Sequence, residues 1–323
     1  MSDRAEEMPP QVAVLDAESA FPARALGARG DETDEVLELA RGGLRQDTFL
    51  RSFRHNVLGM VGLGILVAIV LFSFVGPLLY HSDQLHANIS LTNLGPGKGR
   101  PLGTDANGFD ILGRLMVGGQ VSVEVGLAVA VMATTFGALW GGLSGFTGGV
   151  LDAVLMRIVD VFISVPAIFV LIFLATAFRP SLVVIMLALA FLAWLTPARL
   201  VRGETLSLRT REFVDAARIV GRPRRGIVVR HILPNTFGTI AVNATFQMAD
   251  AIINLAALSF LGFGPPPPVV TWGGMLSQGT TYLLDGYWWE VYPVLLLLTI
   301  TVLSINFLGD ALAETLDARL RSK

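Results

Sequence analysis

Six long apolar runs, separated by polar segments of unequal length, set the pattern of this chain. About 20 consecutive apolar residues are enough for an α-helix to cross the hydrocarbon of a bilayer. The pattern therefore predicts an all-α, polytopic membrane protein with six transmembrane helices. The predicted spans are about 57–79, 122–146, 154–177, 181–198, 236–261 and 291–308.

The composition supports the same class. Of the 323 residues, 53% are hydrophobic and only 15% are charged, and the mean hydropathy is +0.61. A soluble domain of this size could not hide so much apolar surface. The chain has no cysteine, which excludes disulfide frameworks and thiolate metal sites.

The start of the chain differs from the rest. The first 48 residues carry eleven acids and five arginines and have no apolar core. They also lack the basic start and the apolar run of a signal peptide. We expect residues 1–47 to form a disordered, acidic cytoplasmic lead-in and residues 48–323 to form the transmembrane domain.

A basic segment, residues 199–235, separates the fourth span from the fifth. Nine arginines lie between Arg199 and Arg230, against three acids. Gly221 can end one helix in the left-handed conformation, and Pro223 suits the first turn of the next. The segment is predicted to form a helix, a sharp corner and a second helix at the membrane surface.

Small residues in this segment, Ala216, Ala217 and Gly221, would let another surface approach closely. We therefore interpret the segment as a docking site. The alternative is that its arginines only set the topology and meet anionic lipid. That alternative explains the charge but leaves the small residues unexplained.

Charge also predicts the orientation. The long loop 262–290 has no Lys or Arg, the first loop, 80–117, is neutral, and the basic segment is rich in Arg. Because positive loops stay inside, both loops are predicted to be outer and both termini cytoplasmic. Aromatic residues beside the last two spans suggest an outer interfacial belt, namely Trp272, Tyr282, Tyr287, Trp288, Trp289 and Tyr292.

Glycines recur every four residues in the second span, at Gly137, Gly141 and Gly145. Small residues at this spacing let helices pack closely in lipid. They predict either packing within the chain or an interface with a partner membrane subunit. Prolines in the third and fourth spans, Pro166 and Pro197, are each expected to bend or stop a helix.

The fifth span is unusually polar. It contains Asn243, Gln247, Asp250 and Asn254, of which the last three fall on one helical face. An acid inside a span is unfavourable unless it faces water or a partner. The face at Gln247, Asp250 and Asn254 therefore either lines a transport pathway or makes hydrogen bonds inside the protein.

Enzymatic motifs are absent from the sequence. The four histidines form no HExxH, no GxSxG occurs, and the glycines at 95–99 fail the phosphate-loop pattern. The chain is therefore not expected to be an enzyme. If the protein uses ATP, another chain must bind it.

The basic segment resembles the inner-membrane permeases of binding-protein-dependent ABC importers. The matching residues are Asp215-Ala216-Ala217, Gly221 and His231 to Asn235, with Asp215 where Glu is usual. Four further stretches resemble the peptide/nickel branch of this family, and specifically the C permease of dipeptide and oligopeptide importers. These begin at Leu102, Phe146, Leu258 and Asn306. The departures at Phe109, Gln120 and Asn254 concern the outer mouth and the pathway, and Ala318 replaces a usual Pro.

The resemblance implies a type I ABC importer permease fold in a bacterial or archaeal inner membrane. It implies a heterodimer with a second permease, two ATPase subunits that use ATP–Mg, and an extracytoplasmic substrate-binding protein. This chain would bind no cofactor and, apart from membrane lipid, no other class of partner such as nucleic acid. A coupling helix at 214–222 would be seated on one ATPase, with Asp215, Ala216, Ala217, Arg218, Gly221 and Arg222 as its functional residues.

The implied cargo is a dipeptide or oligopeptide, and nickel chelates or another small solute are the alternative within the same class. An ion-coupled secondary transporter would need coupling groups inside its spans, where Asp250 is the only deeply placed acid. A structural subunit would leave the polar face of the fifth span unexplained. An intramembrane hydrolase lacks a plausible nucleophile and base.

Overall fold

The computed structural model describes residues 53–178 and 181–321. The predicted acidic lead-in, residues 1–47, lies outside the described residues. Within them the chain forms helices and loops, with two isolated β-bridges in the loop 80–110. The main helices are α3 (Val57–Phe74), α4 (Gly76–Leu79), α5 (Ile111–Thr147), α6 (Gly149–Ile163), α7 (Ala167–Ala177), α8 (Leu182–Ala193), α9 (Leu195–Leu208), α10 (Glu212–Ile219), α11 (Arg224–Ile227), α12 (Leu233–Asn235), α13 (Phe237–Phe260), α14 (Trp272–Tyr282) and α15 (Tyr292–Arg321).

The predicted all-α membrane fold is confirmed. Among the described residues, five helical stretches are long and apolar enough to cross a membrane, and a bent helix pair makes up to six. The stretches are α3, α5, α8 with α9, α13, and α15 with the short turn before it. The bent pair consists of α6 and α7.

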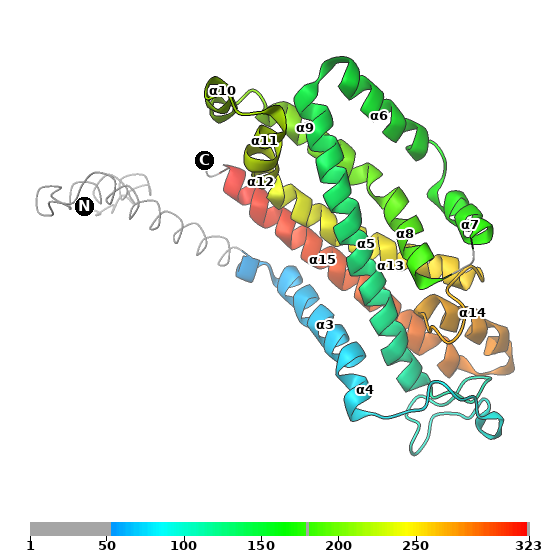
Figure 1. Ribbon diagram of the computed structural model, residues 1–323. Helices are drawn as coiled ribbons and strands as arrows, with labels where there is room; N and C mark the ends of the chain where they lie inside the picture. The colour runs from blue at the N-terminus through cyan, green and yellow to red at the C-terminus, as the bar shows by residue number, and fades with distance from the viewer. Residues whose placement is uncertain (1–52, 179–180, 322–323) are drawn as a thin grey trace, which may run out of the picture. The chain divides into compact units, whose positions relative to one another are not determined.

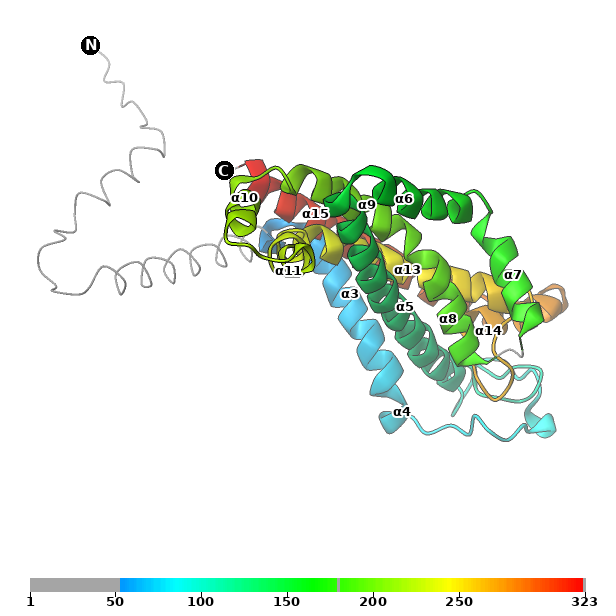
Figure 2. The same cartoon turned by 45° about the horizontal axis from the view of Figure 1, so that its top comes forward.

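These helices give the described part of the chain two distinct ends (Figures 1 and 2). One end holds α10, α11, α12 and the last turns of α15. Here the Asn56 amide, just before α3, donates to Glu314 of α15 over 2.6 Å. The other end holds the loop 80–110 and α14. The first and last described residues therefore lie at the same end as the basic segment.

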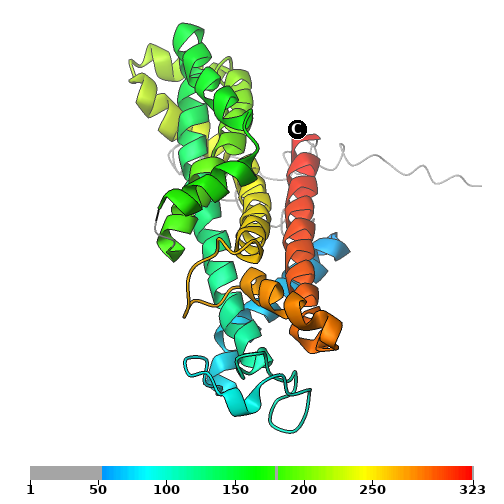
Figure 3. The same ribbon diagram turned by 90° about the vertical axis from the view of Figure 1, so that its right-hand side faces the viewer.

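Helix α5 connects the two ends (Figure 3). Its 37 residues are about 55 Å long, against about 30 Å of bilayer hydrocarbon. It begins at Ile111, inside the predicted outer loop 80–117, because Asp110 caps its first turn. The Asp110 carboxylate accepts from the Gly113 amide over 2.7 Å and from the Tyr80 hydroxyl over 3.2 Å. Burial raises the pKa of the Asp110 carboxyl.

The third and fourth spans also differ from their predicted bounds. The third is broken at Ser164–Pro166, where α6 and α7 meet at 81°. Pro166 is the residue before α7, as expected of a proline that stops one helix and starts the next. The fourth continues beyond the predicted 198 to Leu208. Pro197 lies in the first turn of α9 and has no N–H to donate to the Ala193 carbonyl four residues earlier; the helix is interrupted at Trp194, between α8 and α9, and continues through the proline.

The three glycines of the second span pack against α9 of the same chain. A Cβ on Gly137 would lie 2.6 Å from the Trp194 carbonyl oxygen, and one on Gly145 would lie 2.8 Å from that of Arg202. A Cβ on Gly141 would collide with the Ala198 carbonyl oxygen. Of the two roles left open by the sequence, the structure places these glycines in packing within the chain.

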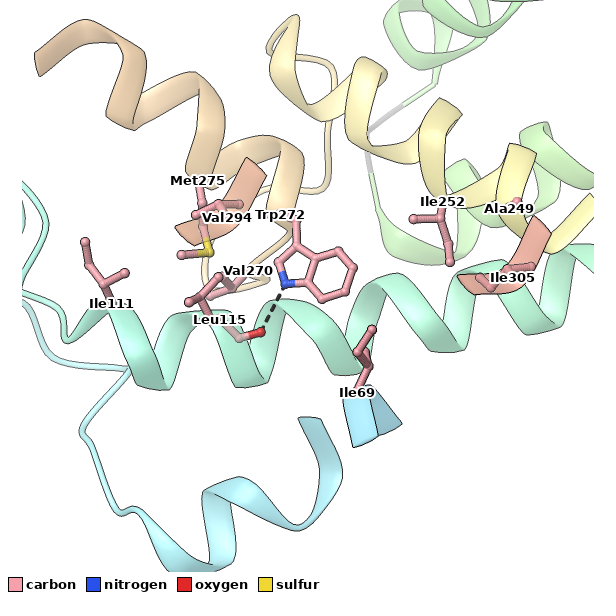
Figure 4. Close-up of a cluster of buried hydrophobic side chains, with 10 residues drawn as sticks. All are labelled: Ile69, Ile111, Leu115, Ala249, Ile252, Val270, Trp272, Met275, Val294 and Ile305. Carbon is pink, nitrogen blue, oxygen red and sulfur yellow. Dashed lines mark hydrogen bonds between the residues drawn. The ribbon is translucent and has the colours of Figure 1, made fainter. Parts of the chain in front are cut away.

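A core cluster at the loop end joins α3, α5, α13, α14 and α15 (Figure 4). Its largest member is Trp272, which is 0% exposed and donates its indole N–H to the Leu115 carbonyl over 3.0 Å. The prediction that Trp272 belongs to an interfacial belt is therefore wrong. Trp288 and Tyr292 are exposed as a belt requires, whereas Trp289 is half-buried and donates to the Thr104 carbonyl. A buried indole needs a hydrogen-bond acceptor, and α5 supplies it.

Close contact between α5 and α9 predicts that Gly141→Ala destabilises the protein by about 1–3 kcal/mol, because the new Cβ forces two backbones apart. The matched control is Gly64→Ala in α3, where a Cβ would meet nothing within 4 Å. We expect the control to leave the thermal unfolding midpoint in detergent unchanged or slightly raised. Equal midpoints for the two variants would contradict the packing.

Candidate functional site

The basic segment folds as a small unit against the end of α5. A hydrophobic cluster holds it there, formed by Phe146, Val214, Ala217, Ile227, Val228 and Ile232. Val214 and Ala217 come from α10, and Phe146 comes from the last turn of α5. Apolar packing therefore holds α10 against the end of α5.

The six residues predicted to couple to an ATPase take different positions on α10 and the corner after it. Asp215, Ala216, Arg218 and Arg222 are exposed, and Arg218 donates to Asp215 over 2.8 Å. Ala217 is buried in the cluster against α5, so it faces this chain. Gly221 has a φ of +77°, in the left-handed region that favours glycine. No atom lies within 4 Å of the position that a Cβ would take, so the reason for glycine here is the backbone conformation and not a lack of space.

Two residues that the sequence interpretation missed stand out on this surface. Ile219 and Val220, at the end of α10, are 86% and 80% exposed. The residues beside them are charged or small. Exposed to water, this apolar tip would therefore have no apolar contact. The signal was present in the sequence, as two β-branched apolar residues directly before Gly221 in an arginine-rich segment.

Helix α9 carries α10 and is tied to its neighbours by arginines. Arg202 makes two hydrogen bonds to Asp152 of α6, over 2.6 and 2.7 Å, and Ser144 of α5 donates to the same carboxylate. Arg199 pairs with Asp160 over 2.5 Å. The two-point pairing fixes direction as well as distance, so α5, α6 and α9 form one block behind α10.

Arg209 lies between α9 and α10 and adds a third tie. Its guanidinium donates to the Gly145 carbonyl over 3.1 Å, at the C-terminal end of α5. A cation at this position also complements the negative end of the helix dipole. The connection to α10 is therefore anchored at the end of α5.

A polar face runs along α13, formed by Thr239, Asn243, Gln247, Asp250 and Asn254 at helical spacing. Gln247 is only 6% exposed and donates to the Ala193 carbonyl over 2.6 Å. That carbonyl is the last of α8, freed by the break before α9. Gln247 therefore makes a hydrogen bond inside the protein, which is the second of the two roles considered for this face.

Asp250 differs from Gln247. It is exposed, and its carboxylate has no hydrogen bond or ion pair to any described residue. Asn254 is half-buried and donates to the Asp250 backbone carbonyl over 2.8 Å. Of the predicted pathway residues Gln247, Asp250 and Asn254, Asp250 is therefore the one whose side chain is free to bind a group outside the described part of this chain.

The loop end is built by a second group of charges. Arg114 of α5 pairs with Asp105 over 3.1 Å and lies 3.9 Å above the ring of Phe109. The Asp105 carboxylate also accepts from the backbone amides of Asn107 and Phe109. These contacts give the loop 80–110 a fixed structure without disulfides. Among the described residues, no group of three or more His, Asp or Glu side chains is arranged to hold a metal ion.

Comparison with known proteins identifies two family models on the chain. Residues 133–322 match the model of the binding-protein-dependent transport system inner membrane component. Residues 44–96 match the N-terminal transmembrane domain of oligopeptide transport permease C. Together they cover the chain from residue 44 to residue 322, apart from residues 97–132, which are the second part of the loop 80–110 and the first part of α5.

Curated relatives extend over most of the chain. The oligopeptide transport system permease protein OppC of Haemophilus influenzae is 37% identical over 289 residues, which are 89% of this chain and 92% of the relative. OppC of Bacillus subtilis is 37% identical over 278 residues, 86% and 90% of the two chains. The dipeptide transport system permease protein DppC of Bacillus subtilis is 34% identical over 271 residues, 84% and 85%. The chain therefore belongs to the family of binding-protein-dependent transport system inner membrane components, and within it to the branch of the oligopeptide and dipeptide permease C proteins.

Proposed function

We propose that this chain forms half of the translocation pathway of an ATP-driven importer for dipeptides or oligopeptides. The relatives that match most of its length are named as oligopeptide and dipeptide permeases. Its partners are a second, homologous permease, two ATPase subunits and an extracytoplasmic substrate-binding protein. ATP and Mg²⁺ are handled by the ATPases, and this chain does no chemistry of its own.

The end that carries α10 faces the cytoplasm in this proposal. It holds the arginine-rich segment, and the first and last described residues lie beside it. The opposite end holds the loop 80–110, α14 and the aromatic residues Trp288 and Tyr292. This distribution agrees with the rule that positive segments stay inside and supports cytoplasmic termini.

The observation that carries the proposal is the exposed apolar tip of α10, Ile219 and Val220. It lies at the end of a helix that is packed rigidly on α5 through Val214 and Ala217. An ATPase that buries this tip gains apolar contact. Because α10 is packed on α5, the contact would move the two helices together. Movement of the ATPase would then reach α5, α6 and α9 together, because the pair of Arg202 and Asp152 links them.

The pathway is assigned to the exposed part of the polar face of α13. Asp250 offers a carboxylate without a partner among the described residues, and Asn254 supports its backbone. A peptide has a cationic amino terminus and many amide groups, which a carboxylate within a water-filled path can bind. Gln247 belongs to the framework of this pathway, because it satisfies the end of α8.

The first prediction concerns the apolar tip. Ile219→Asp places a charge in the contact and removes the burial of a whole side chain, so affinity for the ATPase should fall about 10- to 100-fold. Co-purification of the ATPase with the membrane-inserted chain measures this.

Ile89→Asp is the matched control, because Ile89 is 85% exposed and lies at the other end. The control should retain the ATPase. Full ATPase association by Ile219→Asp would refute docking at the tip.

A second prediction separates the two roles on α13. Asp250→Asn should reduce uptake by about tenfold, equivalent to about 1.4 kcal/mol, and leave ATPase association intact. Gln247→Leu should instead lower thermal stability by about 1–3 kcal/mol, because it leaves the Ala193 carbonyl unsatisfied. Uptake assays in proteoliposomes and thermal unfolding measure the two effects. Normal uptake by Asp250→Asn would remove Asp250 from the pathway.

A further inference from the structure

A buried carboxyl group lies at the loop end and takes no part in the proposed transport pathway. It belongs to Glu290, the last residue of the short turn Trp288–Glu290 before α15, and only 3% of this residue is exposed. Its Oε1 atom is shielded from solvent and receives no hydrogen bond from any described residue. A charged carboxylate in such a place is unfavourable, because neither water nor a hydrogen-bond donor compensates it.

Glu290 lies beyond the hydrocarbon of the membrane. The apolar stretch Trp288–Leu316 has 29 residues, which is about 44 Å of helix against about 30 Å of hydrocarbon. Glu290 is at the first end of this stretch, and the residue before it, Trp289, donates to the Thr104 carbonyl of the loop 80–110 over 3.2 Å. The carboxyl group is therefore in the layer formed by the loops, which faces the outside in the proposed orientation.

Three elements meet at Glu290. From α14, Gly279 comes so close that a Cβ there would lie 2.8 Å from the Glu290 carbonyl oxygen and 3.0 Å from the Glu290 Cβ. From the loop 80–110, the charge of Asp105 acts on the carboxyl group. The turn itself is bound to the same loop through Trp289. We call this meeting point of the turn 288–290, α14 and the loop 80–110 the Glu290 junction.

The surroundings of Glu290 favour its neutral form. Burial, and after it the negative charge of Asp105, raise the pKa of the Glu290 carboxyl to about 7. Arg114 of α5 is paired with Asp105 over 3.1 Å and does not offset the effect of Asp105 on Glu290. Neither α14 nor the first turns of α15 contain Asp, Glu, Lys, Arg or His, and the turn 288–290 contains no second charged residue. No cation at the junction therefore stabilises the ionised form.

We propose that Glu290 makes the outer end of this protein sensitive to pH. When the carboxyl group is protonated, the turn, α14 and the loop 80–110 stay packed together. When it is ionised, it is a buried charge beside Asp105, and water reaches it only if these elements separate. The Glu290 junction therefore loosens as the pH rises through neutrality. Only the side on which pH is sensed rests on the proposed orientation; the loosening itself does not.

The direction of the effect follows from the closed and the opened state of the junction. In an opened state that is exposed to water, the Glu290 carboxyl has its ordinary pKa of 4.5, and in the closed state its pKa is about 7. As the pH rises, the opened state therefore loses its proton first. The stability that this group contributes is fully present below about pH 4.5 and is lost progressively up to about pH 7.

The test measures local opening by hydrogen exchange and mass spectrometry on the purified full-length chain in detergent. Exchange of residues 100–110 and 272–290 is compared between the unchanged protein and Glu290→Gln, at about pH 5 and at about pH 8. At the higher pH we expect both segments to exchange about tenfold more slowly in Glu290→Gln, because glutamine keeps the shape of the side chain and carries no charge. At the lower pH the two proteins should exchange alike.

Two further variants make the result specific. Glu124→Gln removes an exposed carboxyl group from α5, away from the junction, and should exchange as the unchanged protein does at both pH values. Gly279→Ala places a methyl group against the Glu290 backbone. It should open the same segments already at the lower pH, where the unchanged protein is closed.

Equal exchange by the unchanged protein and Glu290→Gln at the higher pH would overturn the proposal. An equal slowing in Glu124→Gln would also overturn it, since the effect would then be one of net charge. If Gly279→Ala stayed closed at the lower pH, the packing at the junction would be refuted. Slower exchange in Glu290→Gln that is confined to the two segments and to the higher pH supports the proposal. Because neither a partner nor transport is measured, failure here leaves the proposed importer function standing.

Discussion

The approach of α5 to α9 at backbone contact is the constraint on which the rest of the structure depends. At Gly137, Gly141 and Gly145, α5 presents no side chain to α9, so its backbone comes close to the carbonyls of Trp194, Ala198 and Arg202. In a membrane no hydrophobic effect drives helices together, so such close packing supplies much of the attraction. It also decides where the arginines of α9 arrive.

Those arginines then fix the neighbouring elements. With α9 against α5, Arg202 reaches Asp152 at the start of α6, and Arg209 reaches the Gly145 carbonyl. The connection to α10 is thereby only three residues long, and Val214 falls into the cluster around Phe146. A surface helix of eight residues would have little stability alone, and this packing explains why α10 forms. The proposed contact with an ATPase rests on that placement.

Much of the fold could be predicted from the sequence because its signals are continuous stretches of one kind of residue. Apolar runs identified the membrane spans, and the arginine-rich segment with Gly221 identified the corner after α10. What could not be predicted depends on contacts between distant parts. Trp272 looks like an interfacial residue until the Leu115 carbonyl of α5 is seen to accept its N–H. Gln247 looks like a pathway residue until the break after Ala193 leaves a carbonyl for it to satisfy.

Element bounds failed for a related reason. Hydropathy ends where polar residues begin, but α5 starts well before its apolar part because Asp110 caps it, and α9 continues beyond its apolar part through the arginines that pair with α6. The apolar residue Ile219 is present in the sequence, but its exposure could not be inferred without knowing that Val214 and Ala217 form the buried side of α10.

The length of α5 has a consequence for how the two ends can change. Its first turns receive the indole of Trp272, and its last turn supplies Phe146 to the cluster that holds α10, with one uninterrupted helix between them. In an α-helix each residue adds a rotation of about 100° about the axis, so a change in the number of residues also changes the relative orientation of the two ends. Adding or removing a single residue between these points would swing one end by more than a quarter of a circle about the axis. The number of residues in α5 is therefore itself a determinant of the fold, whatever the identity of the side chains that face the lipid.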